Sequence, residues 1–150
     1  LGLAEIDAMG NVNVSKFHGR VTGPGGFIDL AQHTKKLILM GTFTAGGLRE
    51  HCEGGRLVID REGKYQKFKT DIEQVTFSGD YAAAHGQHVL VVTERAVFRL
   101  TPQGLMLTEI APGVDLERDI LSQMEFRPLI ADDLQLMDGR IFQPNPMGLS

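Results

Sequence analysis

A three-glycine turn between an apolar segment and a helical pattern is the feature that most constrains this chain. The turn is Gly23-Pro24-Gly25-Gly26, and the helical pattern begins at Phe27. Glycine accepts positive φ angles and has no Cβ atom, so a ligand can approach the backbone closely. The first N–H groups of a helix have no intrahelical acceptors and lie at the positive end of the helix dipole. The turn is therefore predicted to bind an anion or an oxyanion through backbone N–H groups.

An ordinary surface turn that joins a strand to a helix has the same composition, and spacing alone favours that simpler interpretation. The third glycine comes too early for a dinucleotide-binding G-x-G-x-x-G motif. No Gly-Lys-Ser/Thr follows, as it would in a Walker loop. The turn by itself leaves the structural and the functional interpretation open.

The hydrophobic periods along the chain predict one mixed α/β unit over residues 1–150. Residues 1–6 and 12–17 alternate as strands around a hairpin turn, and residues 37–40 form a strand that is apolar on both faces. The order strand, glycine turn, helix, strand is a candidate βαβ crossover. Further strands are expected at residues 56–60, 65–68, 72–77, 88–93, 96–100 and 104–110, followed by a helix capped by Asp115. We expect an antiparallel excursion in the middle of the chain and a C-terminal tail at residues 132–150.

Charge, hydropathy and cysteine content exclude several classes of function. The net charge is −4, and the basic cluster at residues 64–69 is expected to be a solvated strand face, so nucleic acid is not an expected partner. No apolar run approaches the roughly 20 residues of a membrane helix. Cys52 is the only cysteine, which excludes an internal disulfide and a cysteine zinc cluster and suits a reducing cytoplasm. The histidines show no metal-binding motif, so neither a metal nor a permanently bound cofactor is expected.

Several sequence blocks spread over the chain carry a family resemblance. The blocks are GNVNVSKF (10–17), GPGGFID (23–29), GTFTAGG (41–47), VTERAVF (92–98), IAPGVDLERDIL (110–121), QLMD (135–138) and PMGL (146–149). In this order they resemble the C-terminal part of the family I CoA-transferases of the acetate/propionate type. The resemblance implies a partly parallel sheet with flanking helices, as in CoA-transferase and NagB/RpiA-like folds. Because the chain begins at Leu1 as a strand entered from upstream, we expect it to be part of a longer enzyme.

The resemblance also implies a reaction. CoA would move between a short-chain acyl-CoA and a carboxylate such as acetate, through a thioester on an enzyme glutamate. Backbone N–H groups that point at the oxygen of the tetrahedral centre would stabilise its charge. The candidates for this oxyanion and CoA contact are Gly26 and Phe27, with Gly25 giving clearance. Weaker candidates are Gly23, Asn13 as an amide donor to the carbonyl or the pantetheine arm, and Lys16 as a charge for the CoA phosphates.

The family's nucleophile is absent from this sequence. It lies in a Glu-Ser-Gly type segment, and no such segment occurs here, so we assign no catalytic residue and expect the glutamate upstream. Glu94 and Glu109 fall within matching blocks, but their positions beside Arg95 and at a strand end favour structural or solvent-exposed roles. The implied partners are acyl-CoA and small carboxylates as substrates, the N-terminal part of the same enzyme, and further copies in a homo-oligomer. Two alternatives stay open, an acyl-CoA hydrolase on the same fold and a noncatalytic assembly or nucleotide-binding module.

Overall fold

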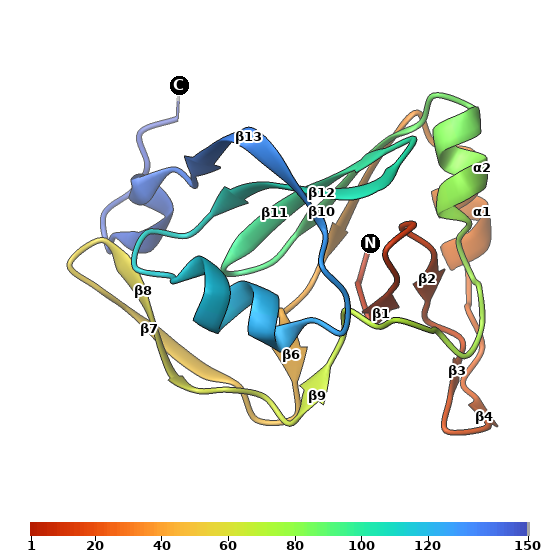
Figure 1. Cartoon of the computed structure of the whole chain (residues 1–150), viewed down its shortest axis with the longest axis horizontal. Coiled ribbons are helices and arrows are strands. Elements are labelled where there is room, and N and C mark those ends of the chain that lie inside the picture. The colour runs from red at the N-terminus through yellow and green to blue at the C-terminus, as the bar shows by residue number, and fades with distance from the viewer. Residues whose placement is uncertain (150) are drawn as a thin grey trace.

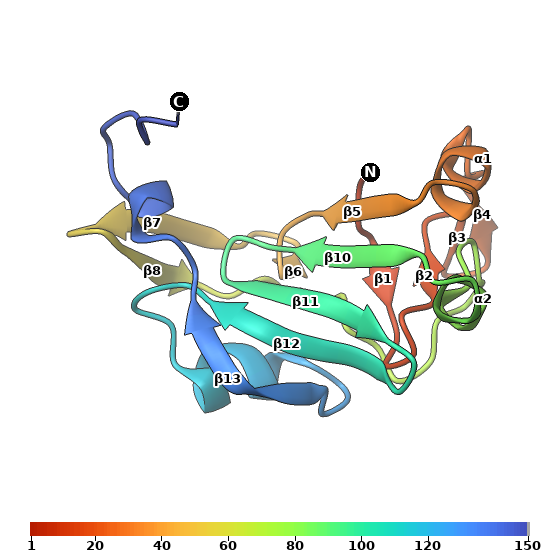
Figure 2. The same ribbon diagram turned by 90° about the horizontal axis from the view of Figure 1, so that it is seen from above.

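A five-stranded mixed sheet forms the centre of the computed structural model, which describes residues 1–149 (Figure 1). In spatial order its strands are β13 (Leu129–Leu136), β12 (Gly104–Ile110), β11 (Ala96–Thr101), β10 (His88–Val92) and β5 (Lys36–Met40). β5 is parallel to β10 and β12 is parallel to β13, whereas β10, β11 and β12 pair as antiparallel neighbours. Figure 2 shows the five strands side by side. The mixed α/β class expected from the hydrophobic periods is confirmed.

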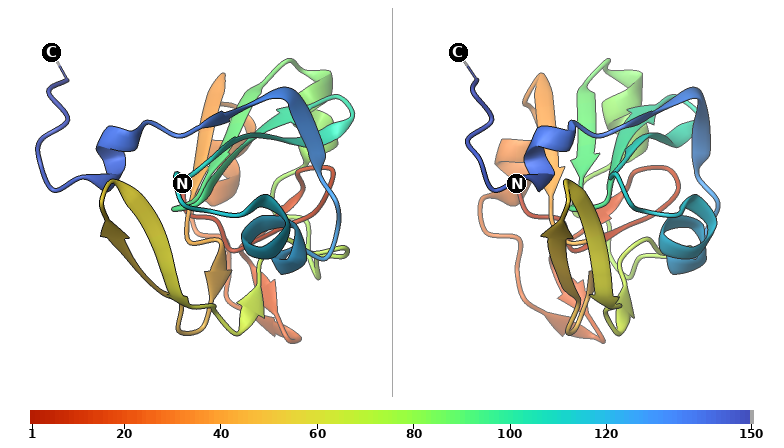
Figure 3. Two further views of the ribbon diagram at one scale, coloured as in Figure 1. Left: turned by 60° about the vertical axis from the view of Figure 1, so that its left-hand side comes forward. Right: turned by 90° about the vertical axis from the view of Figure 1, so that its left-hand side faces the viewer.

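Four two-stranded ribbons accompany the sheet. They pair β1 (Glu5–Ile6) with β2 (Val12–Asn13), β3 (Lys16–Phe17) with β4 (Arg20–Val21), β6 (Thr44–Ala45) with β9 (Tyr65–Gln66), and β7 (Arg49–Glu53) with β8 (Arg56–Arg61). All four pairs are antiparallel, so the antiparallel excursion in the middle of the chain is confirmed. Figure 3 shows the β7–β8 ribbon standing apart from the five-stranded sheet.

The helices are short and stand between or after the strands in the order of the chain. They are α1 (Phe27–Gln32), α2 (Gly79–Ala84), the π-helical turn η1 (Leu116–Ile120) and the 3₁₀ turns η2 (Leu121–Gln123) and η3 (Gly139–Phe142). The Asp115 carboxylate accepts a hydrogen bond from the Arg118 N–H at 2.7 Å, which confirms the predicted helix cap. Among residues 1–149, no helix has the length and apolar character that a membrane crossing requires.

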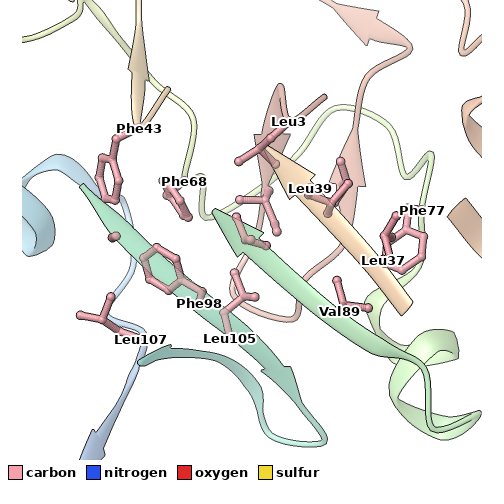
Figure 4. Packing of buried hydrophobic residues seen from close by; sticks show 14 of the residues in the cluster. Leu3, Leu37, Leu39, Phe43, Phe68, Phe77, Val89, Phe98, Leu105 and Leu107 are labelled. Atoms are coloured by element: carbon pink, nitrogen blue, oxygen red, sulfur yellow. The ribbon is translucent and has the colours of Figure 1, made fainter. Parts of the chain in front are cut away.

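The larger hydrophobic cluster lies on one face of the sheet, and a smaller one is formed by Leu57, Val97, Ala111, Met137 and Phe142. Alternate residues of β5 and β10, such as Leu39 and Val91, point into the larger cluster and are fully buried. Phe68 stacks on Phe43 at a centroid distance of 4.5 Å and lies 5.0 Å from Phe98 (Figure 4). Aromatic contacts of this kind add to the free energy gained by burial of apolar area. The core therefore packs the sheet against the segments that carry Phe43 and Phe68.

Four sequence-based expectations are wrong in detail. The strand before the glycine turn, β4, pairs only with β3, so this turn does not belong to a βαβ unit within one sheet. Residues 37–40 are apolar on both faces, but the face of β5 turned away from the core is exposed. Residues 72–77 form no strand, because only Phe77 makes an isolated bridge, to Val12. The expected tail begins too early, since β13 extends to Leu136 and pairs with β12.

Candidate functional site

The glycine turn links the β3–β4 hairpin to α1. Gly23 and Gly25 have φ angles of 80° and 55°, conformations that other residues rarely adopt. The Phe27 N–H donates to the Pro24 carbonyl at 3.1 Å, and the Gly23 N–H donates to the Ser15 carbonyl at 3.3 Å. Among residues 1–149, the N–H groups of Gly25 and Gly26 have no acceptor. The turn thus presents two adjacent donors, which are Gly25 and Gly26 in place of the expected Gly26 and Phe27.

The Phe27 side chain is part of the core and does not extend from the turn. It is buried together with Ala31 on the inner side of α1. Polar contacts fix the other end of the turn, where the Thr22 N–H donates to the Ser15 carbonyl at 2.9 Å. The Ser15 hydroxyl lies 2.7 Å from the Thr76 hydroxyl in a buried pair. The turn is therefore held by packing on its C-terminal side and by hydrogen bonds on its N-terminal side.

Asn13 has structural partners for its whole amide group. Its Nδ2 donates to the Glu5 carboxylate at 2.8 Å and to the Lys16 carbonyl at 2.6 Å. Its Oδ1 accepts from the N–H groups of Ser15 and Lys16, both at 3.1 Å. An amide nitrogen has two hydrogens to donate, and both are used here. The expected donation from Asn13 to a ligand is therefore not available in this structure.

Lys16 lies on the hairpin and pairs with Glu73. The distance between its Nζ and the Glu73 carboxylate is 3.4 Å, and both side chains are about one third exposed. The same carboxylate accepts the Gly19 N–H at 2.8 Å. This backbone hydrogen bond, with help from Lys16, holds the pKa of Glu73 below its usual value. The cation of Lys16 is thus partly neutralised beside the glycine turn.

A groove of about 810 Å³ separates the hairpin that carries the glycine turn from β9. Its walls include Leu3, Glu5, His18, Lys64, Tyr65 and Lys67. His18 is the one residue other than glycine with a positive φ, 51°, within residues 1–149. Strain of this kind at the tip of the hairpin is often found at ligand-binding segments. The groove therefore borders the hairpin that carries the turn, through Phe17 and His18.

Lys67 is the buried cation of this groove and was missed by the sequence interpretation. Only 7% of the residue is exposed, and its Nζ donates to the Thr42 carbonyl at 2.8 Å. Desolvation lowers the pKa of this amine. No carboxylate within residues 1–149 forms an ion pair with it. The expectation of a solvated strand face at residues 64–69 is wrong at this position, and the alternation of lysine with aromatic residues gave no signal for it.

Arg95 is fully buried at the centre of a polar network. It donates to Glu94 at 2.7 Å and to both oxygens of Glu62 at 2.7 and 3.1 Å. Burial raises the pKa of Glu62, but hydrogen bonds from Arg95 and Thr44 outweigh it, so the pKa is lowered. Glu94 also accepts the Phe43 N–H at 2.8 Å. These contacts agree with the structural role expected for Glu94.

Comparisons with known proteins point to one group of enzymes. No protein-family model matches the chain. The chain is 49% identical to acetate CoA-transferase YdiF of Escherichia coli K12 over 148 residues, which cover 99% of the chain and 28% of that protein. It is 48% identical to caffeate CoA-transferase of Acetobacterium woodii over 158 aligned residues, which cover 99% of the chain and 29% of that protein.

The backbone agrees with the sequence comparison. The crystal structure of the acyl-CoA transferase YdiF from E. coli O157:H7, in a thioester complex with CoA, superimposes with a TM-score of 0.96 at 48% identity. The match covers 99% of the chain and 29% of that structure, so the chain spans less than one third of the length of these three relatives. In both sequence and backbone the chain is therefore homologous to part of the length of these family I CoA-transferases.

Proposed function

We propose that the chain is the C-terminal part of a CoA-transferase that moves CoA between a short-chain acyl-CoA and a carboxylate such as acetate. The observation that carries this proposal is 49% identity to an acetate CoA-transferase over nearly the whole chain. The thioester complex with CoA that was solved for a close relative supports a covalent intermediate of that kind. In this proposal the remaining part of the enzyme supplies the glutamate nucleophile, and this chain supplies the glycine turn.

The turn acts on the charge that develops during the reaction. When a carboxylate attacks the acyl thioester, the carbonyl oxygen becomes negative, and fixed N–H donors stabilise it. We assign this role to the N–H groups of Gly25 and Gly26, which are adjacent and have no acceptor among residues 1–149. Phe27 cannot take the role expected for it, because its N–H is bound to the Pro24 carbonyl. One well-placed donor of this kind is worth about 2.7–4 kcal/mol of the barrier.

The groove beside the hairpin is the proposed place for the substrate carboxylate. Lys67 is one of the residues that line it, and its buried ammonium group has only a carbonyl partner, the Thr42 oxygen. A buried ammonium group whose charged neighbour, Glu94, forms no ion pair with it favours the binding of an anion, because the anion replaces the lost solvation. Lys64 lies in the same groove and is exposed, so it adds a second positive charge nearer to solvent.

Substitution of Gly26 tests the role of the turn in the full-length enzyme. Gly26 has an ordinary backbone conformation, with φ at −83°, and the nearest atom to an added Cβ is Leu30 Cδ1 at 3.9 Å. Gly26→Val should therefore leave Tm nearly unchanged while it obstructs the approach of a substrate. We expect kcat to fall about 10²- to 10³-fold, as for the loss of one oxyanion donor. A fall in kcat that is accompanied by a clear fall in Tm, or an unchanged kcat, would show that the turn does not act at the reacting carbonyl.

Gly139→Val is the matched control, since an added Cβ there meets no atom within 4 Å and the residue lies outside the turn. It should change neither Tm nor kcat. Intact-protein mass spectrometry after incubation with acetyl-CoA tests the chemistry itself. A CoA-sized adduct on the full-length enzyme but not on the 150-residue chain is expected, because the nucleophile lies outside it. Release of free CoA that does not depend on added acetate would instead assign the enzyme to thioester hydrolysis.

A further inference from the structure

The β7–β8 ribbon has one attached edge and one open edge. β8 is attached, because its Leu57 N–H donates to the Pro112 carbonyl at 2.8 Å and the Leu57 side chain is buried in the smaller hydrophobic cluster. Within residues 1–149, no strand pairs with the other side of β7, and all five of its residues are exposed (Figure 3). A two-stranded ribbon is only marginally stable in water, and an open strand edge is a template for a further strand.

The alternation of residue pairs along the ribbon shows which backbone groups of β7 point to the open edge. Cys52 lies opposite Leu57, whose N–H is bound to Pro112 outside the ribbon, so these two residues exchange no backbone hydrogen bonds. Bonded and non-bonded pairs alternate in an antiparallel ribbon, so the backbone groups of Cys52 and Glu50 are directed away from β8. The register shift next to Glu50 places the extra residue, Asp60, in β8, and β7 stays regular. The open edge therefore offers two N–H groups and two carbonyl groups, and no other backbone group within residues 1–149 binds them.

The charges of β7 are complementary to those of a second β7 strand in antiparallel orientation. Full overlap of two copies of the sequence Arg-Glu-His-Cys-Glu centres the pair on His51 and places Arg49 of each copy opposite Glu53 of the other. Within residues 1–149, Arg49 forms no ion pair, and Glu53 pairs only with His51, at 3.9 Å. Opposite charges that face each other across two strands stabilise the strand pair. The two His51 rings meet at the centre, and each lies 2.8 Å from the Asp60 carboxylate of its own copy, which offsets their charge.

The same overlap satisfies the backbone groups of the open edge. It places Glu50 of each copy opposite Cys52 of the other, and these are the residues whose backbone groups point outward. Each of these two pairs therefore exchanges two hydrogen bonds. A shift of the pairing toward the loop would bring in Gly54, and a shift in the other direction would bring in Gly47. The φ angles of these two glycines, 58° and 99°, are not those of a strand, so the register that matches the charges is also the one that uses the whole strand.

We propose that the open edge of β7 is a docking surface for the same edge of a second copy of this chain, paired antiparallel and centred on His51. The contact is isologous about a two-fold axis, and it joins two ribbons into one four-stranded sheet in the order β8, β7, β7, β8. The charges favour a second copy, since an unrelated strand would have to carry partners for both Arg49 and Glu53 at the same spacing. Neither the charges nor the backbone pattern depends on the reaction, so this surface is independent of the proposed function and goes beyond it.

A disulfide trap in the full-length enzyme tests the position of the contact. In the proposed register the two copies of residue 51 face each other in a pair without backbone hydrogen bonds, with Cα atoms about 4.5 Å apart, which suits a disulfide. The variant His51→Cys, combined with Cys52→Ser, should therefore form a link between two copies of residue 51 on oxidation with diamide. Arg56→Cys with Cys52→Ser is the matched control, because Arg56 is also exposed but lies on β8, one strand further from the axis, and should give no such link.

The residues that become linked, identified by peptide mass spectrometry, decide the register. Absence of a link at residue 51 would overturn the proposal, because another part of the enzyme would then occupy the edge. A link between the Cys52 residues of two parent chains would show a shifted register and would also overturn it, since Cys52 is expected to lie opposite Glu50. Tm is measured alongside and should not change, because the substituted residues are exposed.

Charge reversal at the ends of β7, measured by sedimentation equilibrium of the 150-residue chain, is a second test that needs no introduced cysteine. Arg49→Glu and Glu53→Arg each place two like-charged pairs in the contact and should weaken self-association at least about tenfold. The double variant restores two pairs of opposite charge and should recover the parent dissociation constant to within about threefold. Arg20→Glu is the matched control, since Arg20 is exposed, forms no ion pair among residues 1–149 and lies on β4, and it should have no such effect. A monomeric parent chain, a double variant as weak as the single ones, or an equal effect of Arg20→Glu would overturn the proposal.

Discussion

Replacement of Arg95 by methionine should destabilise the whole fold. The guanidinium group is fully buried and makes three hydrogen bonds to carboxylates and one, at 3.1 Å, to the Asp119 carbonyl. Methionine fills much of the same volume but leaves the Glu62 and Glu94 carboxylates without their cation. Removal of one partner of a buried ion pair costs about 3–5 kcal/mol. Because Glu62 and Glu94 keep 27% and 15% of their side-chain exposure, we expect a loss near the lower end, about 3 kcal/mol.

Urea unfolding of the 150-residue chain, followed by circular dichroism, measures this loss. Arg118→Met is the matched control, because the Arg118 side chain is 74% exposed and its ion pair with Asp119 should contribute less than about 1 kcal/mol. Arg95→Met combined with Glu62→Gln should recover part of the stability, because the orphaned charge is removed as well. If Arg95→Met costs no more than Arg118→Met, the buried network does not hold the fold together and the reasoning fails.

Three further predictions concern the same chain. The pKa of Glu62 is lowered in the folded state, so the contribution of this carboxylate to stability is present above about pH 4.5 and is lost as the pH falls through the lowered pKa. Between pH 7 and pH 3, the Glu62→Gln variant should therefore lose less stability than the parent chain, as measured by urea titrations. Phe68→Ala removes a fully buried ring between Phe43 and Phe98 and should cost about 3–5 kcal/mol, whereas Val75→Ala at an exposed position should stay within about 0.5 kcal/mol. Gly79→Ala should lower Tm, because its Cβ would lie 2.1 Å from the Met9 carbonyl oxygen, while Gly139→Ala, which meets no atom, should not.

Local signals explain which parts of the fold could be predicted from the sequence. The β10, β11 and β12 strands are short apolar runs joined by short turns, so each pairing depends on neighbouring residues. β13 pairs in parallel with β12 after η1 and η2, and its residues are mostly exposed, so no periodicity indicated it. The segment 72–77 has the composition of a strand, but its Thr76 hydroxyl binds Ser15 and Val14 and only Phe77 pairs with a neighbour.

The candidate site, like the fold, could be predicted from the sequence only in part. Its glycine turn is local and was found from the sequence, although which N–H groups are free depends on the Phe27–Pro24 hydrogen bond. The groove depends on residues that are distant in the sequence, and the burial of Lys67 follows from its contact with Thr42. Nothing in the sequence around a single lysine indicates that its amine is desolvated. The spacing of residues along the sequence is enough to identify a turn, whereas a cavity can be identified only when the positions of several segments in space are known.

The interactions that hold the glycine turn differ from those that hold the core, and this difference has a functional consequence. The turn and its hairpin are fixed by the buried Ser15–Thr76 hydroxyl pair and by Glu73, which binds the Gly19 N–H and Lys16. These contacts involve few apolar atoms, so their loss should free the hairpin without unfolding the sheet. Loss of Arg95 or Phe68 instead removes contacts within the core itself. In the full-length enzyme, substitutions of Ser15, Thr76 or Glu73 should therefore lower turnover at unchanged Tm. Substitutions of Arg95 or Phe68 should lower Tm before they change the chemistry of the turn.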